Sequence, residues 1–232
     1  MSGFEEVTGH PVWRDLAMPA KRHYDSSLPY HNWDHALEVA ENACDLADRF
    51  AARGGKRLHP GVLATAGAWH DAGFAEDHDA LGFETKEHYS AQLAADHLNE
   101  CKRPPAFIEE VRTAILGTIH HAARDNLYAL VLHRADIANI GGPYKPFMVS
   151  AYKLFMEARL RNSAVQFTSW RRSTGVFLGP LISESKEELP RLGEPICGVT
   201  AFPERAASNR RTLMLENEGS LRNKALQELS KA

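Results

Sequence analysis

Apolar residues recur at steps of three and four along much of the chain, and this spacing predicts amphipathic helices. The first predicted helix starts at His31, is ended by Gly54 and Gly55, and has an apolar side formed by Ala36, Val39, Ala40, Ala43, Leu46, Ala47 and Phe50. Similar patterns predict further helices at about 60–73, 84–99, 104–118, 126–140, 147–161 and 203–231. No convincing alternation of apolar and polar residues, as in a strand, is found. The pattern predicts an all-α fold.

Proline and glycine mark the stretches where long helices are not expected. Residues 1–30 contain three prolines and are predicted to form an irregular arm with one short helix. Residues 162–202 contain scattered glycine and proline with little periodicity, which predicts loops with at most short elements. We therefore predict a single domain over 1–232, with a helical core at about 31–140 and a partly irregular C-terminal extension at about 143–232.

Composition and charge narrow the classes of protein that the chain can be. Hydrophobic residues make up 44% of the sequence and charged residues 25%, which is ordinary for a globular protein. The formal net charge of -3 argues against binding of a nucleic-acid polymer. The three cysteines include no CxxC pair, so neither a zinc ribbon nor a disulfide framework is expected. No apolar run approaches the roughly 18 residues of a membrane span, and we expect a cytoplasmic protein without a membrane partner.

Histidine is the residue type whose distribution suggests chemistry. The chain has twelve histidines, and none of them follows His133. His31 and His35 are four residues apart at the start of the first predicted helix, so their side chains should project from the same face. A packed core histidine beside a surface histidine would produce the same spacing. This pair alone therefore leaves both interpretations open.

Two further polar groups occur within apolar helical sequence. His70 and Asp71 end the second predicted helix, where the partial negative charge of a helix C-terminus favours a cation. A helix-capping aspartate with a neighbouring histidine is the alternative interpretation. Asp136 lies within the apolar segment LHRADIANIGG, where it needs a cation or hydrogen-bond donors. Arg134 does not supply them easily, because residues two apart on a helix diverge.

Taken together, these residues resemble the HD superfamily of metal-dependent phosphohydrolases. The likeness rests on the segments YHNWDHALEV, WHDAGF, ETKEHYSA and HRADIANIGG, and within that superfamily it is nearest to small predicted HD phosphohydrolases. It implies an HD-domain helical bundle and a divalent metal ion (Mn, Zn, Fe, Co or Mg) bound by His35, His70, Asp71 and Asp136. Water activated by that ion would attack the phosphorus of a nucleotide or another small phosphorylated substrate.

The resemblance also implies roles for other residues at the same site. His31 becomes the candidate general acid, while Asp71 and Glu87 are candidates to orient the attacking water. We expect the second oxygen of Asp71 to be free for that purpose. His88 and His121 are candidate ligands of a second metal ion. The site is predicted to be mononuclear, with a dinuclear site as the alternative.

Other interpretations of the same motifs stay open. An HD-fold diiron oxygenase would use His88 and His121 for its second iron, and a non-catalytic HD module would bind a nucleotide without hydrolysing it. Arg124, Lys145 and Arg159 are candidates to hold a substrate phosphate, although basic residues of this kind are more often plain surface charges. A lid around Trp170, Arg171 and Arg172 is another candidate. His133 could support Asp136, although a packed core histidine is the simpler interpretation. The oligomeric state is not predicted.

Overall fold

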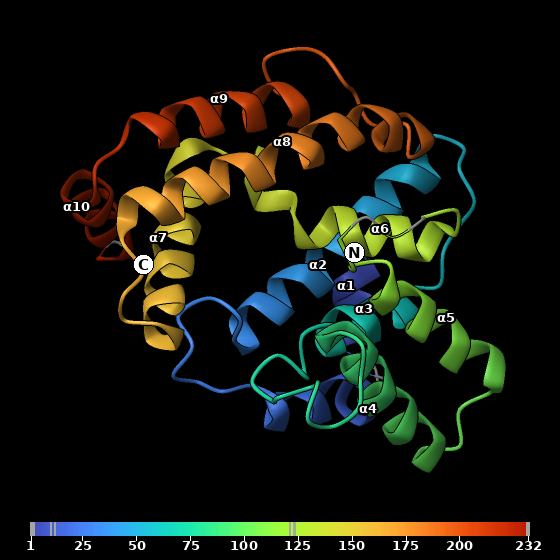
Figure 1. Ribbon diagram of the computed structural model, residues 1–232. Coiled ribbons are helices and arrows are strands. Elements are labelled where there is room, and N and C mark those ends of the chain that lie inside the picture. The colour runs from blue at the N-terminus through green and yellow to red at the C-terminus, as the bar shows by residue number, and fades with distance from the viewer. Residues whose placement is uncertain (1–2, 10, 12, 121, 123, 231–232) are drawn as a thin grey trace. The chain divides into compact units, whose positions relative to one another are not determined.

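The computed structural model describes residues 3–9, 11, 13–120, 122 and 124–230, and it confirms the predicted all-α fold. Helices and their connecting loops form the described part of the chain, and no strand occurs in it (Figure 1). The chain divides into two compact units, Met1–Asp136 and Ile137–Ala232. Each unit is described below by itself.

The first unit is built around a short apolar helix. Its elements are α1 (Gly3–Thr8), η1 (Trp13–Ala17), η2 (Met18–His23), α2 (Trp33–Ala52), α3 (Pro60–Trp69), α4 (Lys86–Glu100), α5 (Pro105–Leu116) and α6 (Leu127–Asp136). Helix α3 packs against α2, α4, α5 and α6, and its residues from Gly61 to Trp69 are all buried. A helix that is apolar on every side belongs in the middle of a bundle. The predicted helices at 60–73, 84–99 and 104–118 correspond to α3, α4 and α5.

Helices α2 and α3 approach each other closely at Gly67. A Cβ atom at this position would lie 2.5 Å from the Cα atom of Ala40, so only glycine fits there. This close packing sets the separation of the two helices just before α3 ends. The ends of α2 and α3 that carry polar side chains are therefore held at a fixed distance.

Helix α2 begins two residues later than the sequence pattern predicts. Asn32 is its N-cap, and the Asn32 side chain accepts hydrogen bonds from the backbone N–H groups of Asp34 and His35. His31 therefore precedes the helix, and the prediction that His31 and His35 share a helical face was wrong. The reason is that a capping side chain stops the helical hydrogen-bond ladder at the residue that provides it.

The N-terminal segment is more ordered than the predicted irregular arm. It contains α1, a π-helical turn η1 and a 3-10 helix η2, and its residues Trp13, Leu16, Ala17 and Ala20 are buried. The indole Nε1 of Trp69 donates a hydrogen bond of 2.7 Å to the carbonyl oxygen of Leu16. The segment thus contributes to the core, although its short and irregular turns leave no periodic signal in the sequence.

The second unit is also helical, and it corrects the largest error of the sequence analysis. It contains η3 (Ala138–Gly141), α7 (Tyr144–Arg161), α8 (Phe167–Arg191), α9 (Phe202–Leu215) and α10 (Glu218–Leu229). Residues 162–202 were predicted to be loops, whereas most of them form the long helix α8, which runs beside α9 (Figure 1). Tertiary packing overrides the local preference here, because α8 buries Phe167, Leu178, Leu181 and Leu189.

Glycine and proline within α8 have positions that the helix tolerates. Gly175 faces α9, and a Cβ atom at Gly175 would lie 2.5 Å from the sulfur of Met214. Pro180 is exposed, so its ring meets solvent rather than the core.

The predicted C-terminal end of one helix in the first unit was also wrong. The helix predicted at 126–140 ends at Asp136, and the 3-10 helix η3 follows it.

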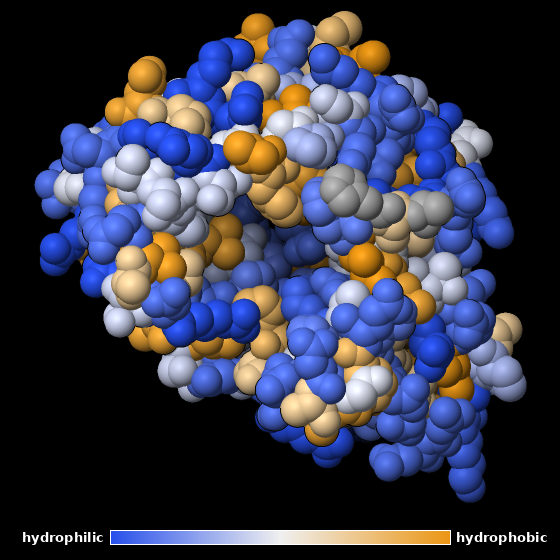
Figure 2. Space-filling view, in the orientation of Figure 1, coloured by the Kyte–Doolittle hydropathy of each residue, from blue (hydrophilic) through white to orange (hydrophobic). Residues whose placement is uncertain are grey.

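None of the described helices is both long and apolar enough to cross a bilayer. Hydrophilic side chains cover most of the face drawn in Figure 2, and hydrophobic ones are scattered among them. The most exposed large apolar side chains in the described part of the chain are Val199 (89%) and Leu215 (86%), both in the second unit.

Candidate metal centre

Four side chains from three distant parts of the sequence meet in the first unit. His35 lies in the first turn of α2, His70 is the C-cap of α3, Asp71 follows it, and Asp136 is the last residue of α6. These are the four residues that the sequence motifs assign to one metal ion. His35, His70 and Asp71 are buried, and the side chain of Asp136 is 24% exposed. The site is therefore assembled from the ends of three packed helices.

The spacing of the donor atoms suits a shared cation. His35 Nε2 lies 3.2 Å from Asp136 Oδ1 and 4.0 Å from Asp71 Oδ2. His70 Nε2 lies 3.2 Å from Asp71 Oδ2 and 3.5 Å from Asp136 Oδ1. Donor atoms that share one tetrahedral ion at ~2.1 Å lie roughly 3.4 Å apart. The three separations of 3.2–3.5 Å are close to that value, and the separation of 4.0 Å between His35 Nε2 and Asp71 Oδ2 is longer.

One ring nitrogen in this cluster lacks a hydrogen bond. The Nδ1–H of His70 donates to the carbonyl oxygen of Gly67 at 2.7 Å, which leaves Nε2 as the free lone pair of the neutral imidazole. His70 Nε2 is buried and has no hydrogen-bond partner, although the carboxylates of Asp71 and Asp136 are near. A lone pair facing carboxylate oxygens is repulsive unless a positive charge lies between them. The arrangement therefore fits a metal ion, with a proton as its only simple substitute.

The pKa values show how strongly the cluster attracts positive charge. Burial lowers the pKa of His70, but the carboxylates of Asp71 and Asp136 outweigh burial and raise this pKa to about 10. Burial raises the pKa of Asp71, whereas the charges of Lys86 and His70 hold it well below its usual range. The hydrogen bond from His35 and the nearby charge of His70 similarly hold the pKa of Asp136 low against the effect of burial. Without a metal ion, His70 is expected to carry a proton between two ionised carboxylates.

A lysine that the sequence analysis did not identify contacts the cluster. Lys86 Nζ lies 2.6 Å from Asp71 Oδ1 and 2.9 Å from Glu87 Oε1, and thus links the two carboxylates. The expectation that the second oxygen of Asp71 is free to orient water was wrong, because Lys86 occupies it. Burial disfavours the Lys86 charge, but Asp71 and Glu87 outweigh it and raise the pKa of the ammonium group. Lys86 is in the ETKEHYSA motif, but its contact with Asp71 depends on the tertiary fold.

The N-terminal segment supplies a second supporting residue that was missed. The Tyr24 hydroxyl donates to the carbonyl oxygen of Ala68 at 3.0 Å and accepts from the backbone N–H of Asp71 at 3.3 Å. Just beyond, the backbone N–H of Gly73 donates to Ser90 Oγ at 2.9 Å. The turn that carries His70 and Asp71 is consequently tied on one side to Tyr24 and on the other side to α4.

The two other predicted catalytic residues lie beside Asp71. His31 Nε2 is 4.0 Å from Asp71 Oδ2, and the His31 side chain is 18% exposed. Its ring stacks on that of Phe74, with a centroid distance of 3.8 Å and an interplanar angle of 21°. Glu87 joins the cluster through Lys86, whose charge keeps the pKa of Glu87 below its usual range despite burial. His31 is thus partly accessible, whereas Glu87 is engaged in an ion pair.

Of the two candidate ligands of a second metal ion, the structure describes only His88. His88 lies in the first turn of α4, and its Nδ1 is 3.1 Å from the hydroxyl of Thr85, the N-cap of that helix. The compact group of possible ligand atoms at this site, all within 4.8 Å of one another, consists of His35, His70 and Asp71. Asp136 lies outside this group but approaches both of its histidines, whereas His88 has no contact of that kind among the described ion pairs. His121 lies outside the described residues.

Arg124 and His133 are the remaining candidate residues of the first unit, and both are buried. Arg124 is buried, and its guanidinium donates to the carbonyl oxygens of Gly117 at 2.9 Å and Ile119 at 3.0 Å. The burial of His133, with help from the nearby positive charges of Arg124 and Arg134, lowers its pKa to about 3. Arg124 thus supports the loop after α5, and His133 is expected to be neutral near pH 7.

The basic candidates of the second unit pair with neighbouring residues there. Lys145 lies 3.7 Å from Glu228, and Arg159 lies 3.8 Å from Glu218. Arg171 donates to the carbonyl oxygen of Glu216. Arg172 is exposed, and the Trp170 ring packs on Phe155 and Phe167. The predicted lid is therefore part of helix α8 and its apolar packing.

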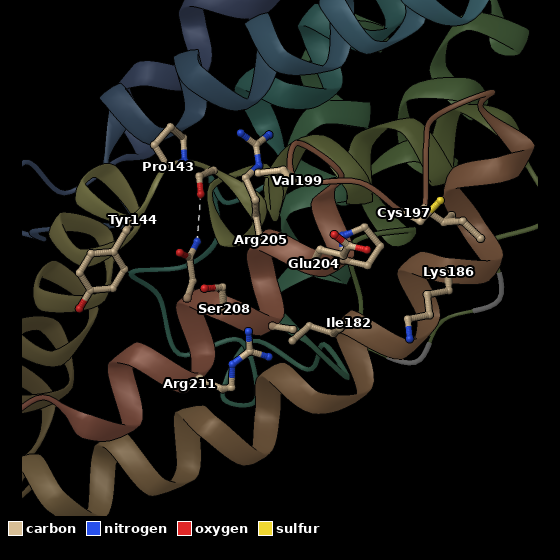
Figure 3. Close-up of a pocket in the computed structure, with 15 residues that line it drawn as sticks. Pro143, Tyr144, Ile182, Lys186, Cys197, Val199, Glu204, Arg205, Ser208 and Arg211 are labelled. Carbon is tan, nitrogen blue, oxygen red and sulfur yellow. Dashed lines mark hydrogen bonds between the residues drawn. The ribbon is translucent and has the colours of Figure 1, made fainter.

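The second unit also contains a pocket of about 870 Å³ along α9. Its basic residues are Lys186, Arg205 and Arg211, and Glu204 is its acidic one. Figure 3 shows that the side chains of Arg205 and Lys186 point in opposite directions. Because the positive charges do not converge on one point, the pocket lacks the geometry of an anion-binding site.

Comparison with known proteins does not identify a family for this chain. The chain matches no protein-family model and no curated protein. The function must therefore be argued from the geometry of the metal centre together with the four short motifs that contain it.

Proposed function

We propose that this chain is a metal-dependent phosphohydrolase built on an HD-domain helical bundle. In this proposal His35, His70, Asp71 and Asp136 bind one divalent ion, and the substrate is a nucleotide or another small phosphorylated molecule. The observation that carries the proposal is the convergence of these four side chains around the unpartnered Nε2 of His70. The four residues come from separate motifs and from the ends of α2, α3 and α6, and packing of these helices brings them together.

The donor set determines what an ion would do at this site. Two imidazoles and two carboxylates balance the charge of a divalent ion, and nitrogen and oxygen ligands suit manganese, iron, cobalt or zinc. When bound, such an ion supplies an activated water molecule and polarises a phosphoryl oxygen. This chemistry is what hydrolysis of a phosphoester requires.

The residues around the ligands would handle protons and substrate. His31 is partly exposed and held by stacking on Phe74, so it can protonate a leaving oxygen as a general acid. The ammonium group of Lys86 has three N–H donors, of which Asp71 and Glu87 accept two. The third donor can bind a phosphoryl oxygen, since the Lys86 side chain is 30% exposed.

A single ion is favoured over the diiron alternative. A second iron would need His88 as a ligand, but the ring of His88 makes a hydrogen bond with the hydroxyl of Thr85. No observation on the described residues favours the non-catalytic binding module either. The hydrolase is therefore the proposal that accounts for most of the site.

The test is metal analysis of the purified protein, followed by a phosphate-release screen over nucleotides and sugar phosphates. We expect activity that a chelator abolishes and that manganese, cobalt or zinc restores. Asp136→Ala should lose both metal and activity, whereas Asp79→Ala, a change at a surface acid that is 83% exposed, should keep both. The proposal would be rejected if the protein bound a divalent ion but released no phosphate from any substrate, or if Asp136→Ala remained active.

A further inference from the structure

The ion pair between Lys86 and Glu87 lies directly against one metal ligand. Lys86 Nζ contacts Asp71 Oδ1 at 2.6 Å, while the other oxygen, Asp71 Oδ2, faces His70 Nε2 at 3.2 Å. The two oxygens of Asp71 therefore have different partners. The carboxylate cannot rotate about its Cβ–Cγ bond without losing the contact with Lys86.

Lys86 is itself held in place by several elements. It is the first residue of α4, directly after the N-cap Thr85. Glu87 Oε1 accepts from its ammonium group at 2.9 Å, and the Phe74 ring lies 5.5 Å from Nζ. The hydrogen bond from Gly73 to Ser90 fastens the turn after Asp71 to the same helix. A lysine anchored in this way can hold another side chain in one orientation.

The charges in this arrangement nearly cancel. The positive charge of Lys86 is balanced by Glu87, so the pair adds little net charge to the four ligands. Its effect on a bound cation should therefore come from orientation rather than from its field. We propose that Lys86 is a positioning residue, which turns Asp71 Oδ2 toward His35 and His70 and is kept there by Glu87. This inference rests on the metal-binding part of the proposed function.

Replacement of Lys86 by methionine separates orientation from charge. If Lys86 only contributes charge, Lys86→Met removes a cation next to a ligand and leaves Glu87 uncompensated, so a divalent ion should bind more tightly. If Lys86 orients Asp71, the same change releases the carboxylate and the ion should bind less tightly. The direction of the change in affinity thus decides between the two explanations.

The experiment measures Zn²⁺ and Co²⁺ affinity by competition with a chromophoric chelator. For Lys86→Met we expect affinity to fall by about 10- to 100-fold, as when other groups that hold metal ligands are removed. The visible absorption bands of bound Co²⁺ should also shift, since they report the arrangement of the ligands. Lys86→Arg, which keeps a charged donor, should retain most of the wild-type affinity and spectrum.

Two further variants keep the test decisive. Lys86→Gln is used if Lys86→Met does not fold, as judged by circular dichroism, because it also removes the charge and the sign of its effect has the same meaning. Lys56→Met is the matched control, since Lys56 is exposed and belongs to the same unit. Its affinity should equal that of the wild type.

The possible results distinguish this inference from the proposed function. Equal or tighter binding by Lys86→Met or Lys86→Gln, with an unchanged Co²⁺ spectrum, would overturn the role of Lys86 and leave the hydrolase proposal intact. Weaker binding with a shifted spectrum would support the role even if the wild type hydrolysed no phosphoester. If the wild type bound no divalent ion, both proposals would be rejected.

Discussion

At the scale of single residues, His70 would make metal binding at the proposed site depend on pH. Its Nδ1 is committed to the carbonyl oxygen of Gly67, so the charge state of the ring depends on Nε2 alone. The raised pKa, about 10, means that the metal-free site holds a proton at neutral pH where the metal ion would be. At the proposed site, a metal ion and a proton would therefore compete for Nε2 of His70.

This competition predicts proton release when the metal ion binds. At pH 7, binding should release about one proton from His70, and the apparent affinity should rise with pH by about tenfold per unit until the pH reaches the pKa of His70. Calorimetric titration in buffers of different ionisation enthalpy measures the number of protons. Binding without proton release would show that His70 is neutral in the metal-free protein.

The same pKa predicts how stability depends on pH without metal. The pKa is higher in the folded protein than the 6.5 of the free side chain, so His70 stabilises the metal-free fold fully below about pH 6.5. This contribution should be lost as the pH rises toward 10. Urea unfolding of the metal-free protein at several pH values measures it. A free energy of unfolding that rose steadily over this interval would contradict the prediction.

Tyr24 provides a residue-scale test of the support for Asp71. Tyr24→Phe removes the donor to Ala68 and the acceptor for the backbone N–H of Asp71, and leaves both groups without these bonds. We expect a loss of about 1–3 kcal/mol in the free energy of unfolding, measured in urea. Tyr152→Phe is the matched control, since the described structure contains no hydrogen bond from the Tyr152 hydroxyl, and it should change stability little. Equal effects of the two changes would contradict the role of Tyr24.

The residues of the site differ in how far the sequence could predict them. The four candidate ligands were predicted from the resemblance of their motifs to HD phosphohydrolases, and a polar residue that needs a partner within an apolar helix pointed the same way for His70, Asp71 and Asp136. Lys86 and Tyr24 were missed because their importance comes from contacts with Asp71 across 15 and 47 residues, respectively. Local sequence contains no signal for such contacts.

At the scale of elements, the close approach of α2 and α3 carries a prediction. Gly67→Ala would place a methyl group 2.5 Å from the Cα atom of Ala40, so the helices must separate. We expect a loss of about 1–3 kcal/mol in the free energy of unfolding and weaker metal binding, because Gly67 also accepts the hydrogen bond from His70.

Gly179 on α8 is the control for this change. No atom lies within 4 Å of a Cβ placed there, so Gly179→Ala should be neutral or stabilise the fold by up to about 1 kcal/mol. Thermal and urea unfolding of both variants measures the difference. The packing argument fails if Gly67→Ala is as stable as the wild type.

The elements that were predicted well are those with a continuous apolar stripe. Helices α2, α4 and α5 have such stripes and α3 is apolar on every side, and their predicted bounds differ from the observed ones by only a few residues. Helix α8 was missed because its glycine and proline residues signal a loop locally, and only its packing reveals a helix. Helix α6 was predicted to be too long, since the apolar residues of η3 continue its pattern.

At the scale of the whole molecule, the ligands and the C-terminal helices belong to different compact units. A ligand that binds only the folded state stabilises the unit that holds it, by about 2.7 kcal/mol at 100 times its dissociation constant. Hydrogen exchange with and without Zn²⁺ should therefore show increased protection in α2, α3 and α6. Protection confined to α7–α10 would contradict the location of the site.

The position of Asp136 has a practical consequence for dividing the protein. This proposed ligand is the final residue of the first unit, and Ile137 is the first residue of the second. A chain cut at that border would gain a new terminal carboxylate on the ligand itself, adding a competing negative group to the coordination set. Anyone isolating the N-terminal helices should extend them beyond Gly142, where the 3-10 turn has ended, if the metal chemistry is to be preserved.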